Sequence, residues 1–171
     1  MGILGHAYAA NEQFNDALQA ANSGNTELLQ QYQMSMQNDV LGYYPEYWAL
    51  NANLGFQPAN NIINFARRYP QSAMAEKLAA DYVEEKVKQA DFSTAQPVLP
   101  YVTNPDQAES CAVAQVRAKT GDSLVFAEYK DVWLTTNSQP ESCTGLARQM
   151  LSSPLMTQQD KQQRLWSLLR A

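Results

Sequence analysis

Apolar residues recur along this chain at the three- and four-residue spacings of amphipathic helices. The stretches SGNTELLQQY and TGDSLVFAEY show this pattern in the same phase, with apolar residues at +3, +4 and +7 from Asn25 and from Asp122. A glycine precedes each of these polar residues, Gly24 and Gly121, which suits the end of one helix and the N-cap of the next. Strand-like alternation is absent, so the pattern predicts helices connected by similar turns.

Similar turns return at a regular interval. Gly24, Gly55, Ala90 and Gly121 are separated by 31, 35 and 31 residues, and the next turn is expected near residue 152. Two helices per period of this length are typical of a helix-pair solenoid. We therefore predict an all-α superhelical solenoid of about five helix pairs and no β-sheet. The expected helices cover 9–22, 25–37, 43–54, 58–68, 72–89, 91–101, 106–119, 122–134, 140–152 and 157–170.

Charge is distributed unevenly over the 171 residues. Residues 1–66 contain five acidic residues and no Lys or Arg, so the net charge of −5 comes wholly from this part. Nucleic-acid binding needs clustered basic side chains to neutralise phosphates. The acidic composition therefore argues against a nucleic-acid partner.

Two further expectations concern membrane helices and the first residues of the chain. No apolar run approaches the ~18 residues of a membrane helix. Residues 1–8 are expected to be an appended expression leader or a signal-peptide remnant, because Ala7-Tyr8-Ala9 resembles a secretory cleavage site without an apolar segment before it. Residues 9–171 are expected to form the helical domain.

Candidate catalytic groups are few. His6 is the only histidine and lies in the expected leader, so neither a Ser-His-Asp nor a Cys-His arrangement is available. One histidine and two cysteines are too few for a structural zinc site, and no glycine-rich phosphate motif is present. Glu109 and Glu141 form a conceivable glycosidase pair, but each is better explained as a first-turn helix residue. We assign no catalytic, cofactor-binding or metal-binding residue.

An aromatic stretch, GYYPEYWAL, has two interpretations. Aromatic rings can stack on the apolar faces of sugars. However, Tyr44, Tyr47 and Trp48 lie at helical spacing, which favours packing between helix pairs.

The tripeptide ESC occurs twice and contains the only cysteines, Cys111 and Cys143. Their separation of 32 residues is about one repeat, which places them at equivalent positions of neighbouring helix pairs. A disulfide is geometrically feasible there. Two buried free thiols are the alternative.

The segment TGDSLVFAEYKDVWLTTNSQPESCTGL resembles the N-terminal superhelical domain of the soluble lytic murein transglycosylases of Gram-negative bacteria. The block W-L-T-x-x-S-Q-P-x-x-C is the most specific part of the resemblance, which runs from about residue 11 to residue 171. The residues that carry it are Thr120, Gly121, Trp133, Leu134, Thr135, Ser138, Gln139, Pro140, Cys143 and Leu146, with Leu41, Tyr44, Glu46, Tyr47, Phe65, Pro70 and Leu78 upstream.

The resemblance implies a U-shaped helical domain of a periplasmic enzyme that needs no cofactor. Such enzymes cleave the β-1,4 bond between N-acetylmuramic acid and N-acetylglucosamine of peptidoglycan and form a 1,6-anhydro product. Their catalytic Glu-Ser lies in a C-terminal lysozyme-like domain and is followed by a G-L-M-Q-type segment. The oxidising periplasm favours the disulfide between Cys111 and Cys143.

The sequence departs from the family pattern because no G-L-M-Q segment follows Glu109-Ser110 or Glu141-Ser142. No catalytic role is transferred to either pair, and the chain is expected to be a non-catalytic fragment of a longer enzyme. An unrelated solenoid that binds a protein or peptide is the alternative. We also expect Trp166, Leu168 and Leu169 to form an exposed apolar edge that promotes self-association.

Overall fold

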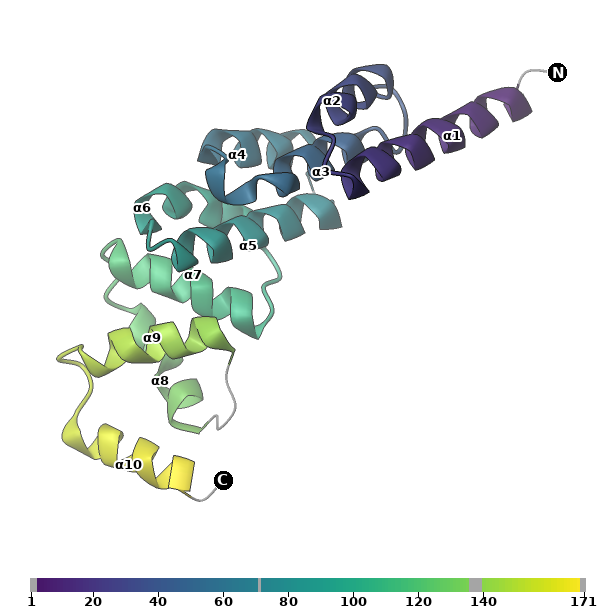
Figure 1. The fold of residues 1–171 in the computed structure, drawn as a ribbon. Helices are drawn as coiled ribbons and strands as arrows, with labels where there is room; N and C mark the ends of the chain where they lie inside the picture. Colours follow the sequence, from purple (N-terminus) through teal and green to yellow (C-terminus); the bar gives the residue numbers. More distant parts are fainter. Residues whose placement is uncertain (1–2, 71, 136–139, 170–171) are drawn as a thin grey trace. The chain divides into compact units, whose positions relative to one another are not determined.

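Helices follow one another along the whole described part of the chain, which comprises residues 3–70, 72–135 and 140–169 of a computed structural model (Figure 1). These residues form ten α-helices and two 3₁₀-helices, without a strand, which confirms the predicted all-α class. The α-helices are α1 (Ile3–Asn22), α2 (Thr26–Ser35), α3 (Tyr43–Ala52), α4 (Ala59–Arg68), α5 (Ala73–Lys88), α6 (Phe92–Ala95), α7 (Gln107–Lys119), α8 (Val125–Thr135), α9 (Glu141–Leu151) and α10 (Gln158–Leu169). The 3₁₀-helices are η1 (Leu54–Phe56) and η2 (Gln96–Tyr101).

The chain divides into two compact units within α5. The first unit is Met1–Leu78 and the second unit is Ala79–Ala171. In the first unit, α1, α2 and α3 pack against one another and α4 packs against α3. In the second unit, α7 lies beside α9, and α8 packs against α10 (Figure 1).

Three of the four predicted turns share one backbone conformation. Gly24, Ala90 and Gly121 have positive φ angles of 69°, 57° and 102°. The residue after each donates its N–H to the carbonyl five positions earlier, as in a Schellman motif. These bonds are Asn25 to Ala20, Asp91 to Lys86 and Asp122 to Arg117. The Asn25 side chain then accepts the N–H of Leu28 and caps α2, as predicted. The side chain of Asp122, predicted as the cap of the helix after Gly121, instead accepts the N–H of Leu124 in the turn before α8.

The turn predicted at Gly55 is different. Gly55 lies in η1, and α4 begins at Ala59 after an extended Pro58. Because Pro58 cannot continue a helix from the residue before it, the chain closes two 3₁₀ hydrogen bonds, Phe56 to Asn53 and Gln57 to Leu54, in place of a Schellman motif. The turn expected near residue 152 is also different, because Ser152 ends α9 in a right-handed conformation.

Three predicted helix boundaries need correction. The helix expected at 9–22 begins at Ile3, within the expected leader. The helix expected at 91–101 is one α-turn, α6, followed by η2, because Pro97 and Pro100 lack backbone donors. The helix expected at 122–134 begins at Val125, because the side chain of Asp122 accepts the N–H of Leu124 and holds a turn before it.

Candidate functional site

The two cysteines lie on neighbouring helices and form a disulfide. Cys111 of α7 and Cys143 of α9 are bonded, with their Cα atoms 4.9 Å apart. Beside them, Ser142 Oγ donates to the carbonyl of Ala108 at 2.8 Å, and Gln149 Nε2 donates to Gln115 Oε1 at 3.2 Å. Contacts therefore advance in the same direction along both helices, at offsets of 32 to 34 residues. Helices α7 and α9 run parallel, as equivalent helices of consecutive pairs do.

A glycine permits this close approach. A Cβ atom at Gly145 of α9 would lie 2.7 to 2.9 Å from the side-chain carboxamide of Gln115 on α7. That carboxamide is buried and donates from Nε2 to the carbonyl of Ser142 at 2.6 Å. The amide of Gln115 therefore occupies the space in which other residues at position 145 would place a side chain.

The sequence block that carries the family resemblance forms the core around this disulfide. Trp133 and Leu134 are buried with Cys143 and Leu146 in one apolar cluster. Ser138 and Gln139 of the same block lie outside the described residues. The described apolar residues of the block are thus conspicuous in the sequence because they pack together around the disulfide.

The two candidate glutamates lie at helix starts, as the structural interpretation predicted. Glu109 Oε2 accepts the N–H of Asp106 at 2.8 Å, while Asp106 Oδ1 accepts the N–H of Glu109 at 2.9 Å. This capping box begins α7. Glu141 lies in the first turn of α9.

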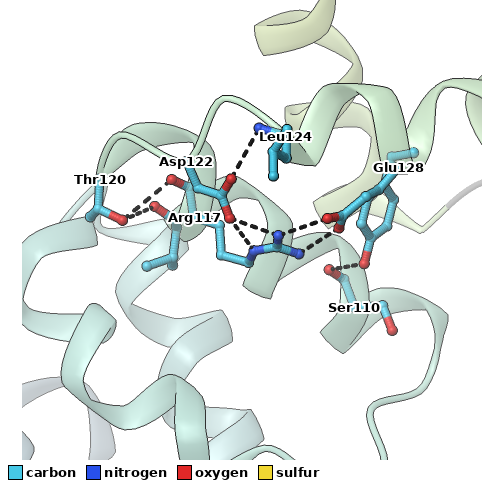
Figure 2. Close-up of polar contacts among 8 residues, drawn as sticks. Ser110, Arg117, Thr120, Asp122, Leu124 and Glu128 are labelled. Atoms are coloured by element: carbon cyan, nitrogen blue, oxygen red, sulfur yellow. Dashed lines mark hydrogen bonds and ion pairs between the residues drawn. The ribbon is translucent and has the colours of Figure 1, made fainter.

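Arg117 holds the turn between α7 and α8 (Figure 2). Its guanidinium donates to Asp122 Oδ2 at 2.8 Å and forms two hydrogen bonds to the carboxylate of Glu128, at 2.7 and 3.1 Å. Hydrogen bonding to Arg117 holds the pKa of both carboxyl groups below their usual values. Tyr129 donates its hydroxyl to the carbonyl of Ser110 at 3.0 Å and thereby ties α8 to α7. These polar groups are mutually satisfied and have a structural role.

A groove of about 420 Å³ lies in the second unit, between α5, α7 and α9. Its charged lining residues are Glu84, Lys88, Glu141 and Arg148. Burial raises the pKa of Glu84, and the charge of Lys88 opposes this increase. The groove presents two acids and two bases, which suits a ligand that carries charges of both signs.

A second groove, of about 330 Å³, lies in the first unit and has a different chemistry. We call it the carboxamide groove, because five of its lining side chains are carboxamides: Gln30, Gln33, Gln57, Asn61 and Asn64. These side chains come from α2, from α4 and from the segment between η1 and α4. Asn61 Nδ2 donates to Gln57 Oε1 at 2.9 Å, which fixes the orientation of two of the amides.

One ion pair also lines the carboxamide groove. Glu46 of α3 is 7% exposed, and its carboxylate accepts a hydrogen bond from Arg68 of α4. The guanidinium of Arg68 also lies 5.6 Å from the centre of the Tyr69 ring. Burial raises the pKa of the Tyr69 hydroxyl, and the negative charge of Glu46 adds to the effect. A half-buried tyrosine therefore adjoins the ion pair.

The aromatic stretch of α3 packs between helices, as the spacing favoured. Phe14 of α1 contacts the rings of Tyr44 and Trp48 at 5.3 and 5.5 Å between centroids. On the other side, Tyr47 is buried beside Phe65 of α4. Tyr43 and Tyr69, 5.6 Å apart between centroids, are half-buried and keep part of their surface open to solvent.

The apolar edge expected near the end of the chain is exposed. Leu165, Trp166, Leu168 and Leu169 of α10 are each between 47% and 69% exposed. Self-association through this face stays a prediction.

Within the described ranges, no group of three or more His, Cys, Asp or Glu side chains is arranged to hold a metal ion. None of the described helices is long and apolar enough to cross a membrane.

Sequence reasoning missed both grooves. The richness of residues 1–66 in Asn and Gln was the signal for the carboxamide groove, but helical spacing alone did not show which of these side chains share a surface. The carboxamide groove depends on how α2, α3 and α4 cross, and that is a tertiary property.

Known proteins match this chain in both sequence and structure, although no protein-family model does. The soluble lytic murein transglycosylase of Escherichia coli strain K12 is 27% identical over 129 residues, which are 75% of this chain and 20% of that protein. The soluble lytic murein transglycosylase of Salmonella typhimurium strain LT2 is 26% identical over the same lengths. The chain therefore spans about one fifth of the length of these relatives.

Two solved structures share the fold. The 70 kDa soluble lytic transglycosylase SLT70 from Escherichia coli superimposes with a TM-score of 0.74, over 92% of this chain and 25% of that one, at 23% identity. A 70-kDa soluble lytic transglycosylase in complex with bulgecin A gives a TM-score of 0.73 over the same shares. These matches confirm the resemblance drawn from the sequence: the chain is related to part of these transglycosylases and has the helical fold of the matching part.

Proposed function

We propose that this chain is a non-catalytic helical domain of a periplasmic soluble lytic murein transglycosylase and that it associates with peptidoglycan. The observation that carries the proposal is the combined similarity to these enzymes, 27% identity over 75% of the chain and a shared fold over 92% of it. In the proposed enzyme, another domain supplies the glutamate that cleaves the β-1,4 bond between N-acetylmuramic acid and N-acetylglucosamine and forms the 1,6-anhydro product.

The position of Glu109 supports a non-catalytic role for this candidate acid. Glu109 is engaged in the capping box of α7, and its Ser110 neighbour accepts the Tyr129 hydroxyl through its carbonyl. A general acid for glycoside cleavage needs to reach the glycosidic oxygen of a bound sugar. A carboxylate held by the backbone N–H of the N-cap residue Asp106 is poorly placed for that task.

The proposal is tested by incubating the purified 171-residue chain with Gram-negative sacculi. We expect the chain to sediment with the sacculi and to release no 1,6-anhydro muropeptides, as measured by chromatography of the supernatant. Release of such products by the chain alone would contradict the non-catalytic assignment.

The alternative, a solenoid that binds a protein or peptide, is tested in the same experiment with an immobilised peptide library. Retention on peptides without sedimentation with sacculi would favour that alternative and overturn the proposal.

A further inference from the structure

We propose that the carboxamide groove of the first unit is a binding subsite for the uncharged sugar backbone of a β-1,4-linked amino-sugar glycan. This inference rests on the proposed function and adds to it the ligand class and the place of contact. It is argued from the chemistry of the lining side chains, from their charge balance and from the adjoining rings.

The lining chemistry suits hydroxyl and acetamido groups. A carboxamide presents a donor and an acceptor in one plane, so it can accept from one sugar hydroxyl while it donates to its neighbour. Five such groups line the groove: Asn61 and Asn64 lie one turn apart on α4, Gln30 and Gln33 lie about one turn apart on α2, and Gln57 precedes α4. Groups that can each donate and accept form the pattern expected for a ligand with many hydroxyls and no charge.

The charge balance also favours a neutral ligand. Glu46 and Arg68 pair with each other, so the charged side chains that line the groove compensate one another. By contrast, the groove of the second unit presents four charged side chains. A neutral glycan that enters the carboxamide groove therefore displaces water from fewer charged side chains than one that enters the other groove, so less hydration energy is lost.

Aromatic surface adjoins the polar lining. Arg68 contacts both Glu46 in the groove and the ring of Tyr69, and Tyr69 in turn packs against Tyr43. Tyrosine rings combine an apolar face with a polar edge. Half-buried rings beside hydrogen-bonding amides offer a surface for the apolar face of a pyranose that extends beyond the groove.

The test is a titration of the ¹⁵N-labelled chain with chitotetraose, the β-1,4 tetramer of N-acetylglucosamine, followed by NMR. The side-chain NH₂ signals of the groove amides report contact directly. We expect those of Gln33 and Asn64 to shift together with backbone signals of α2 and α4, while the signals of Glu84 and Arg148 in the other groove stay in place.

Two variants decide whether the groove carries the binding. Gln33→Ala combined with Asn64→Ala removes one hydrogen-bonding group from each wall, and we expect the Kd for chitotetraose to rise by about tenfold or more. Asn60→Ala is the matched control, because Asn60 is also an exposed asparagine of α4 but does not line the groove. The control is expected to bind as the unmodified chain does, and circular dichroism checks that both variants keep their helices.

The inference would be overturned by the absence of shifts with chitotetraose, by shifts confined to the second-unit groove, or by equal affinity of the double variant and the control. Shifts of the groove amides with a free stem peptide but not with the tetramer would do so too. Sedimentation with sacculi separates this failure from failure of the proposed function. If the chain sediments with sacculi but does not bind chitotetraose, only the proposed subsite is overturned. If it binds chitotetraose but does not sediment with sacculi, the proposed function is overturned.

Discussion

The two units are built from similar helix pairs but are stabilised by different interactions. In the first unit, rings from α1, α3 and α4 contact one another in a continuous series that includes Phe14, Tyr44, Tyr43, Tyr69 and Phe65. In the second unit, a disulfide joins α7 to α9, and a bidentate Arg117–Glu128 pair fastens α8 to the end of α7.

The difference shows that helix pairs with the same repeat pattern can be stabilised by different kinds of interaction. Aromatic packing depends on burial and contact area, and it fails when a ring is removed. A covalent link constrains the unfolded chain as well as the folded one. The first unit, which combines aromatic packing with a polar groove, is therefore expected to respond most to core substitutions, and the second unit to reductant.

The largest expected effect is on the aromatic packing of the first unit. Phe65→Ala removes a fully buried ring that contacts Tyr47 and Tyr69 and leaves a cavity. We expect the free energy of unfolding to fall by about 3–5 kcal/mol. Urea denaturation measures the loss, and hydrogen exchange should show that the lost protection lies in α3 and α4. Phe56→Ala is the control, because Phe56 is 91% exposed, and it should change stability by about 0.5 kcal/mol or less.

Loss of the disulfide should affect the other unit. Replacing both Cys111 and Cys143 with Ala opens a loop of 32 residues and is expected to cost about 3–4 kcal/mol on the chain-entropy model. Hydrogen exchange should increase in α7 and α9. Reductant should destabilise the unmodified chain but not the variant. If exchange increased equally in α1–α4, the contrast between the units would be wrong.

A smaller effect is expected where α7 and α9 approach each other. Gly145→Ala forces the buried carboxamide of Gln115 aside, which outweighs the gain in helix propensity from alanine, so we expect a net loss of about 1 kcal/mol. Adding Gln115→Ala removes the obstacle. A double-mutant cycle measured by urea denaturation should therefore give a coupling energy of about 0.5 kcal/mol or more. Strict additivity of the two substitutions would show that the glycine is not needed for this contact.

The smallest expected effect depends on pH and concerns the attachment of α10 to α8. Lys130 of α8, 2.8 Å from Asp160, and the hydrogen bonds of Thr157 lower the pKa of Asp160 to about 2. Because the folded-state pKa lies below the unfolded one, this stabilisation is present above about pH 4 and is lost as the pH falls towards 2.

Asp160→Asn should therefore flatten the dependence of stability on pH between about 5 and 2, measured by thermal unfolding at each pH. Lys130→Met should do the same, since it removes the main cause of the lowered pKa. Lys161→Met, one residue further along α10, is expected to keep the slope. An unchanged slope in Asp160→Asn would contradict the assigned role of this carboxylate.

Local signals in the sequence predicted the helices and most of their turns. Helical spacing and cap residues depend on neighbours within a few positions, so Asn25 and the left-handed turns at Gly24 and Gly121 could be identified without a fold. The separation of Cys111 and Cys143 by one repeat also indicated their proximity, because equivalent helices of adjacent pairs lie side by side. Prediction failed locally where proline acted, at η1 and at η2.

The sequence by itself determined that this protein is a series of helix pairs and that it is related to part of a lytic transglycosylase. It also indicated that the two cysteines occupy equivalent positions of neighbouring helix pairs. Only the tertiary structure decided which polar side chains share a surface. Gln33 and Asn64 are 31 residues apart and meet in one groove because α2 and α4 both pack beside α3. Buried side chains such as Leu29 and Ile62 set how those helices cross. The pattern of polar residues on the outer faces does not determine this crossing, so it could not predict which polar side chains meet.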